Sequence, residues 1–464
     1  MEKLSLKFSQ YLYWGVLGLF VFIPLYPKFP LFNIPGTYVA IRLEDFLITL
    51  VILWWFITII PKLKFFLDKK ITQAILVFWG IGALSLYSGL TVTHSLSPGL
   101  GMLHFARRVE FMSLFFVSLA AFKNFKQVKL WLSVMFLVTT IVTLYGFGQQ
   151  LLRFPVVSTT NREFSKGLIL YLTPDARVNS TFAGHYDLAV YLAFFMIVAA
   201  SFFIHHRSIF KRAIIVTVSV LSFILLAMTA ARVSFFAFLL GIVALLVLVK
   251  QKKLILVLIL VSLLAFAVSP DLRHRTVATI TVNLLGGGGA KYTPPPQKKI
   301  PTSYFSIQNA APGSATPSGV PVDVVPGEPL NSTELGVFRS YGIRLDVEWP
   351  RAVRAFFKNP FLGTGYSSIT IATDNDYLRA LGETGLLGTL SLGLIFTIII
   401  RRLWKFLKTA AKDQNYYLVV GVFCGLIALA LNAFFIDVLE SSKVAELLWL
   451  TLGVTYSVVK MKRA

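Results

Sequence analysis

The chain has 464 residues, of which 56% are hydrophobic and 14% aromatic, and its mean hydropathy is +0.73. This hydrophobic fraction is larger than the core of a soluble protein of this size would need. It therefore excludes a soluble globular protein and indicates an integral membrane protein. The formal net charge of +23 would suit a nucleic-acid binder if it formed one patch, but the basic residues are spread along the chain.

Apolar runs close to the length that crosses a hydrocarbon core, roughly 20 residues, recur along the sequence. They begin near Gln10, Phe46, Thr72, Leu103, Val128, Tyr186, Ala213, Val233, Leu254, Gly385, Tyr416 and Val444. The sequence therefore predicts an all-α integral membrane protein, a polytopic bundle of about twelve transmembrane helices. Because the runs from Val233 and Leu254 are slightly short, about eleven to thirteen spans remain open.

Basic residues gather in every second loop of this predicted bundle. They are Lys62, Lys64, Lys69 and Lys70, then Lys123, Lys126 and Lys129, then Arg207, Lys211 and Arg212, then Lys250, Lys252 and Lys253, then Arg401, Arg402, Lys405, Lys408 and Lys412, and finally Lys460, Lys462 and Arg463. By the positive-inside rule, these loops and both termini face the cytoplasm, which predicts a multi-pass protein of the cytoplasmic (inner) membrane. Topology then accounts for the charge, and no nucleic-acid partner is expected.

The sequence lacks the common motifs for metal ions and nucleotides. The only cysteine, Cys424, lies inside a predicted span, and the six histidines show no metal-ligand spacing. No P-loop is present. We therefore expect no cofactor, no metal ion and no requirement for ATP.

The predicted spans divide the chain into three parts. Residues 1–268 would form the first nine transmembrane helices, residues 269–384 a large external loop between helices 9 and 10, and residues 385–464 the last three helices. Within the loop, residues 286–330 are rich in Gly, Pro and Ser and poor in apolar side chains, which predicts a flexible linker. Residues 331–384 hold the polar groups that topology leaves unexplained, and we interpret them as a substrate-site segment.

That segment contains a predicted short helix. Pro350 suits a helix start and the pair Asn359-Pro360 a helix end. Val353, Phe356 and Phe357 share one broad face, opposite basic residues, so we expect the helix to lie on the membrane surface.

Polar residues are concentrated in the stretch TDNDYLRALGETGLLG, residues 373–388, directly before an apolar run. Its charged and amide side chains are Asp374, Asn375, Asp376, Arg379 and Glu383. Asp374 suits an N-cap, which would place Asp376, Arg379 and Glu383 on one side of a helix that enters the membrane at Gly385. One interpretation is an interfacial salt-bridge ladder. The other, for Asp374 and Asn375, is binding of an anion or polar ligand at the helix start.

The longer run NPFLGTGYSSITIATDNDYLRALGETGLLG resembles the signature of the O-antigen ligase and polymerase superfamily. In that family a Pro-x-x-Gly-x-Gly turn precedes a polar HN-x-x-L-x-x-x-x-E-x-G-x-x-G helix. RRVEFMSLFF, RVNSTFAGHYDLAVYL, TAARVS and SYGIRLDVEW are similar, in order, to the family's Arg-x-x-Glu-Tyr, Arg-x-x-x-Thr-Phe-Gly, Thr-x-Ser-Arg and Ser-x-x-Arg-x-x-x-Trp stretches. These matches are scattered over most of the chain and become specific together, because their spacing and sidedness both fit.

The resemblance implies a metal-independent membrane glycosyltransferase of surface polysaccharide biosynthesis in the cell envelope. Its donor would be a glycan on undecaprenyl diphosphate, and it would transfer or polymerise that glycan onto a glycan or lipid acceptor at the outer face of the membrane. One position departs from the family, because Asp374 stands where family ligases carry His. A carboxylate can still act as a base or orient a hydroxyl, and the change favours a polymerase-like or divergent transferase over a ligase.

Arginine residues are the expected partners of the leaving diphosphate, because the planar guanidinium stays charged and binds oxyanions bidentately. The diphosphate-binding candidates are Arg177, Arg232 and Arg344. Arg232 is also a catalytic candidate, because a charge in a tight turn between two apolar spans is costly unless it is used; its alternative is snorkelling to the headgroups. Arg344 could instead pair with Asp346 or Glu348.

The acceptor hydroxyl would be handled by the catalytic candidates Asp374 and Asn375, next to a Gly363 and Gly365 turn that would let a substrate approach the backbone. The secondary candidates are His185, Asp376, Arg379, Arg107 and Arg108. His185 could equally be a satisfied interfacial histidine, and Arg107 and Arg108 could form a buried charge network with Glu110.

Two other functions compete with a transferase. A flippase or transporter of lipid-linked oligosaccharide would share the spans, the basic face and the arginines, but transporters tend to have repeated halves and the sequence shows no internal repeat. A non-catalytic scaffold would leave the external Arg and Asp residues unexplained. We therefore favour the transferase and keep the flippase as the alternative.

Overall fold

The computed structural model describes residues 2–35, 37, 39–60, 63–67, 69–156, 170–172, 176–285, 291, 329, 331–369 and 372–462. Most of these residues are helical, consistent with the predicted all-α membrane protein. A small antiparallel pair, β1 (Pro30–Asn33) with β2 (Ala40–Arg42), lies between the first two helices. Apart from Lys291 and Pro329, the predicted linker 286–330 lies outside the described residues.

Every predicted apolar run forms a helix. These helices are α1 (Glu2–Leu25), α2 (Leu43–Ile59), α4 (Lys70–Thr91), α5 (Pro98–Ala121), α6 (Phe125–Leu151), α7 (His185–His205), α8 (Ile209–Met228), α9 (Arg232–Leu248), α10 (Leu254–Val268), α14 (Asp376–Thr409), α15 (Gln414–Asn432) and α16 (Ser442–Met461). The remaining helices are short: α3 (Leu63–Leu67), α11 (Pro270–Ala278), α12 (Ser332–Gly342), α13 (Trp349–Lys358) and the π-helical turns η3 (Thr279–Leu284) and η4 (Ile343–Glu348).

The predicted number of membrane crossings, about twelve, is not confirmed. Within the described part of the chain, 7 helices are long and apolar enough to cross a membrane, namely α4, α6, α7, α8, α14, α15 and α16. The pair α10 and α11, bent by 97°, would make up to 8. The difference arises because α2 and α9 have 17 residues each, about 26 Å of helix, and because α5 carries charged side chains in its middle.

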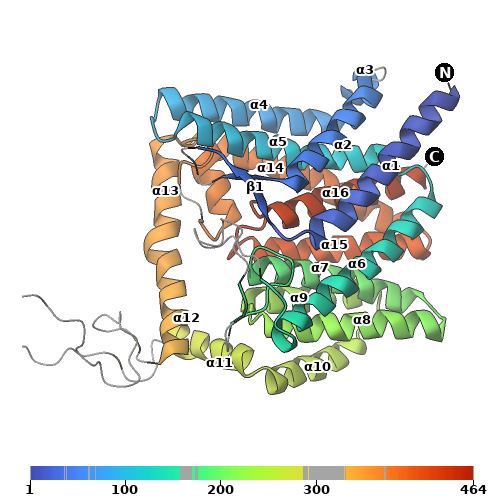
Figure 1. Cartoon of the computed structure of the whole chain (residues 1–464), viewed down its shortest axis with the longest axis vertical. Helices are drawn as coiled ribbons and strands as arrows, with labels where there is room; N and C mark the ends of the chain where they lie inside the picture. The colour runs from blue at the N-terminus through green and yellow to red at the C-terminus, as the bar shows by residue number, and fades with distance from the viewer. Residues whose placement is uncertain are drawn as a thin grey trace, which may run out of the picture.

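The long helices pack side by side as one bundle, with both chain termini on the same side (Figure 1). On the opposite side, α12 and α13 run across the ends of the bundle helices (Figure 1). This sidedness agrees with the topology predicted from the basic loops, although the orientation of the bundle in a membrane stays a prediction. The division at residues 268 and 384 also stays a prediction.

The core is centred on α16, which packs against α5 and α15, while α15 also packs against α7 and α9. Close helix approach depends on small residues: a Cβ on Gly453 of α16 would lie 2.4 Å from the backbone oxygen of Phe115 in α5. The predicted short helix near Pro350 is present as α13. It buries Ala352 and Ala355 against α14 and leaves Val353 and Phe357 exposed.

Candidate active site

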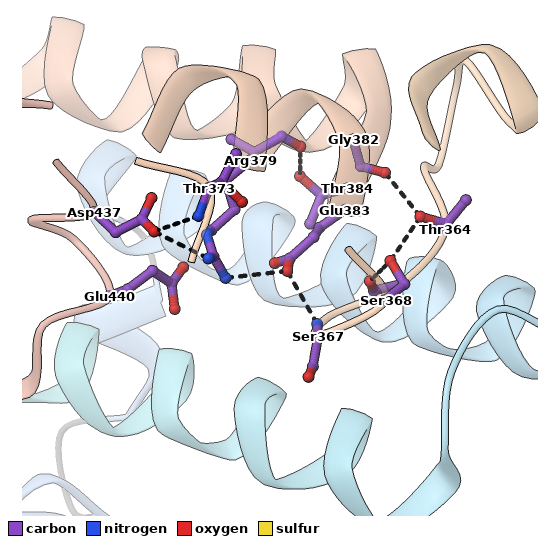
Figure 2. Close-up of polar contacts among 12 residues, drawn as sticks. Thr364, Ser367, Ser368, Thr373, Arg379, Gly382, Glu383, Thr384, Asp437 and Glu440 are labelled. Carbon is purple, nitrogen blue, oxygen red and sulfur yellow. Dashed lines mark hydrogen bonds and ion pairs between the residues drawn. The ribbon is translucent and has the colours of Figure 1, made fainter. Parts of the chain in front are cut away.

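A single carboxylate holds the polar turn that precedes α14. Asp437, in the connection between α15 and α16, accepts hydrogen bonds from the backbone N–H groups of Thr373 at 2.8 Å, Asp374 at 3.1 Å and Asn375 at 3.3 Å. Its Oδ2 also lies 3.0 Å from Nη2 of Arg379 (Figure 2). The Asp437 side chain therefore fixes both the turn and the first helical turn of α14.

The predicted N-cap at Asp374 is wrong, because Asn375 occupies that position. Asn375 has an extended backbone, with φ −166° and ψ 100°, and its side chain accepts a hydrogen bond from the N–H of Leu378 at 3.0 Å. Asp374 has a φ of 50°, in the left-handed region that Asp tolerates better than most residues. Its side chain is consequently turned away from the helix start and is available for another contact.

Of the salt-bridge ladder predicted along α14, the pair of Arg379 and Glu383 is present, and it is buried and not interfacial. Arg379 and Glu383 lie 3.4 Å apart, and each side chain is 3% exposed. Asp376 accepts a hydrogen bond from the N–H of Leu439 at 3.0 Å. Figure 2 shows Arg379 between Asp437 and Glu383, with Glu383 directed toward the backbone of Ser367. This network joins α14 to the α15–α16 connection. Asp376 and Arg379 therefore have a structural role in holding these elements together.

Arg107 and Arg108, the other secondary candidates, point to different partners. Arg108 donates to the backbone oxygen of Leu439 at 2.9 Å and forms an ion pair with Glu440, so it extends the same buried network. Arg107 lies 3.9 Å from Asp45 at the start of α2. Arg108 therefore belongs to a buried charge network, but its acidic partner is Glu440 and not the predicted Glu110.

The Gly363 and Gly365 turn packs against a break in α14 and is filled by the chain's own backbone. Gly385 interrupts the helix with φ 65° and ψ −168°. Gly365 donates its N–H to the backbone oxygen of Glu383 at 2.9 Å, and a Cβ on Gly363 would lie 2.4 Å from the backbone carbon of Glu383. The glycines therefore serve close packing of two backbone segments, and the expected approach of a substrate to this turn stays a prediction.

The three arginines predicted to bind diphosphate converge on one pocket. Arg177 precedes α7, Arg232 begins α9 and Arg344 lies on η4, yet all three line the same pocket. Arg275 of α11 is a fourth lining arginine that the sequence motifs did not indicate. The other lining residues are Tyr186, Ala230, Val233, Phe435 and Ile436. We call this group of four arginines and its lining the arginine pocket.

The tight turn between α8 and α9 aims Arg232 into the protein. Ala230 adopts a left-handed backbone with φ 50°, a conformation that costs a non-glycine residue about 1 to 3 kcal/mol. Arg232 then donates to the backbone oxygen of Arg275 at 3.0 Å and contacts the hydroxyl of Thr279. These contacts oppose the snorkelling interpretation, because the guanidinium is held by α11 and η3.

Arg344 connects the arginine pocket to Asp374. Nη2 of Arg344 and Oδ2 of Asp374 form an ion pair at 2.5 Å. The expected alternative, pairing of Arg344 with Asp346 or Glu348, is therefore wrong. Burial raises the pKa of the Asp374 carboxyl, and the charge of Arg344 counteracts this shift. Asp374 thus has its backbone anchored on Asp437 and its carboxylate directed to the arginines.

His185 is held by Arg177, with 2.6 Å between Nε2 of the imidazole and Nη1 of the guanidinium. A guanidinium can only donate hydrogen bonds, so this contact requires Nε2 to accept and the imidazole to be neutral. In this arrangement His185 positions Arg177. Among the residues that the structure describes, no group of three or more His, Cys, Asp or Glu side chains is arranged to hold a metal ion.

Comparison with known protein families identifies a related family. No curated protein matches the chain. A family model described as O-Antigen ligase matches residues 217–393, a span that runs from α8 into α14 and contains Arg232, Arg275, Arg344 and Asp374. Residues 217–393 are therefore similar to the O-antigen ligase family, which confirms the resemblance to that superfamily predicted from the sequence motifs.

Proposed function

We propose that this protein is a glycosyltransferase that takes a glycan from undecaprenyl diphosphate and joins it to a glycan or lipid acceptor at the outer face of the cytoplasmic membrane. The family match supports glycan transfer in a membrane. The observation that carries the finer proposal is the arginine pocket, which is joined to Asp374 through the ion pair with Arg344.

The arginine pocket suits the leaving group of this reaction. Cleavage of the anomeric bond leaves the electron pair and negative charge on the diphosphate, and preorganised guanidinium groups stabilise that charge in the transition state. Arg232 adds the amino terminus of α9, whose unpaired N–H groups also favour an anion. Four arginines without a paired acid for each would repel one another, and a bound diphosphate would relieve this repulsion.

In this proposal, the acceptor binds on the Asp374 side of the arginine pocket. A carboxylate next to the leaving diphosphate can accept a hydrogen bond from the attacking hydroxyl and orient it toward the anomeric carbon. Asn375 contributes indirectly, because its side chain caps α14 and fixes the backbone beside Asp374. The replacement of the family's His by Asp374 leads us to favour polymerisation over ligation.

The flippase alternative has no specific support in the family match or in the site. A transfer assay separates the possibilities. Purified protein in lipid nanodiscs is given a radiolabelled undecaprenyl-diphosphate glycan, with and without a lipid acceptor, in the presence of EDTA. We expect a longer lipid-linked ladder if the protein polymerises and a labelled acceptor if it ligates. An unchanged donor in both reactions would contradict the proposed function.

A further inference from the structure

Glu348 is a second carboxyl group near Asp374, and it has no role in the proposed transfer reaction. It ends the π-helical turn η4, four residues after Arg344, so both side chains leave the same side of the turn. Irregular π-helical turns are frequent at functional sites. The next residue, Trp349, packs its ring 6.4 Å from that of Phe435, a lining residue of the arginine pocket.

One oxygen of this carboxyl group is buried and unused. Oε2 of Glu348 has no hydrogen-bond partner among the described residues. Native structures rarely leave a buried polar atom unpaired, and such an atom is often a position where a ligand supplies the missing group. A substrate hydroxyl would provide the donor that Oε2 lacks.

Four charged groups surround Glu348. The pKa of Glu348 is raised to about 7, chiefly by burial; repulsion from Asp374 and Asp437 acts in the same direction, and attraction from Arg344 and Arg379 acts against it. At neutral pH this carboxyl group therefore exchanges its proton readily. Asp374 differs, because its carboxylate is engaged by Arg344 at 2.5 Å, and a carboxylate in such a charge-assisted pair is a weaker proton acceptor.

We propose that Glu348 is the general base of glycan transfer and that Asp374, held by Arg344, orients the acceptor hydroxyl. This inference rests on the proposed function. The hydroxyl gives its proton to Oε2 of Glu348 while its oxygen forms a bond to the anomeric carbon. The bond from that carbon to the diphosphate oxygen breaks, and the electron pair leaves with the diphosphate into the arginine pocket. Glu348 then releases the proton to the outer aqueous phase.

The test compares Glu348→Gln with Asp346→Asn, a change of an exposed carboxyl group on the same turn. Glu348→Gln should lower kcat about 10²- to 10⁴-fold, the usual contribution of a positioned base, while the Kd for the lipid-linked donor stays unchanged. Asp346→Asn should keep wild-type kcat. Wild-type turnover in a monodisperse Glu348→Gln protein would overturn the inference.

The pH dependence gives a second readout that does not depend on the folding of Glu348→Gln. A base must be ionised, so wild-type kcat should rise with pH through about 7 and be lost below it. Asp374→Asn removes a like charge and so lowers the pKa of Glu348. The rise of the remaining kcat with pH, which forms the acidic limb of the pH profile, should therefore move to lower pH. A limb that stays in place in Asp374→Asn would contradict our assignment. Wild-type protein that shows no transfer at any pH would instead reject the proposed function itself.

Discussion

Replacing Asp437 by Asn should destabilise the protein strongly, because one carboxylate oxygen serves three donors. Oδ2 accepts from the N–H groups of Thr373 and Asp374 and from Arg379, whose side chain is 3% exposed. In Asp437→Asn an amide NH₂ replaces one oxygen, so Arg379 loses one of its charged partners. Breaking a buried ion pair on one side typically costs about 3 to 5 kcal/mol.

The assay is thermal denaturation of detergent-solubilised protein, followed by the loss of the monodisperse peak in size-exclusion chromatography. Asp413→Asn is the matched control. Asp413 also pairs with a basic residue, Lys462 at 2.7 Å, and caps α15, but its side chain is 44% exposed. Because Asn caps about as well as Asp and exposed pairs contribute about 0 to 1 kcal/mol, the control should change little. Equal stability of Asp437→Asn and Asp413→Asn would refute our account of the buried network.

Three further predictions follow from the contacts. Arg232→Lys keeps the charge but loses the planar fork, so the transition state of transfer should lose about 2 to 4 kcal/mol of stabilisation and kcat should fall accordingly. Near-wild-type kcat in a well-expressed Arg232→Ala protein would contradict this. Asn375→Ala should lower stability by about 1 kcal/mol through loss of the cap, whereas Asp374→Asn, which weakens only the partly exposed pair with Arg344, should lower kcat far more than it lowers stability; the reverse pattern would indicate that Asp374 is the cap. A cysteine at Lys358 on exposed α13 should react with a membrane-impermeant thiol reagent in intact cells, and one at Lys408 only after lysis; the opposite labelling would invert the topology.

The elements of the fold could be predicted where the signal is local. Apolar runs of sufficient length became helices, and Pro350 with the pair Asn359-Pro360 marked the limits of α13 within one residue or so. Membrane crossing is a weaker inference, because helices such as α9 are apolar but only 17 residues long. Length and composition alone do not decide whether such a helix spans a bilayer.

The candidate site was only partly predictable, for a different reason. The family motifs contain three of the pocket arginines, Arg177, Arg232 and Arg344. Arg275 lies outside these motifs and joins the other three only because α11 folds back beside α9. Asp437 is 64 positions from Thr373 in the sequence, so no local pattern indicates their contact. The exchange of the cap from Asp374 to Asn375 depends on the left-handed backbone of Asp374, which side-chain identity alone does not specify.

The central claim is that the arginine pocket holds the diphosphate of the donor, and equilibrium binding of undecaprenyl diphosphate to protein in nanodiscs tests it most directly. Arg275→Ala should weaken binding about 10- to 150-fold, the loss of one hydrogen bond to a charged group at about 1.5 to 3 kcal/mol. Arg401→Ala, which removes an exposed arginine near the end of α14, should leave the Kd unchanged. Equal affinity of the wild-type and Arg275→Ala proteins, or equal loss in both variants, would contradict the account.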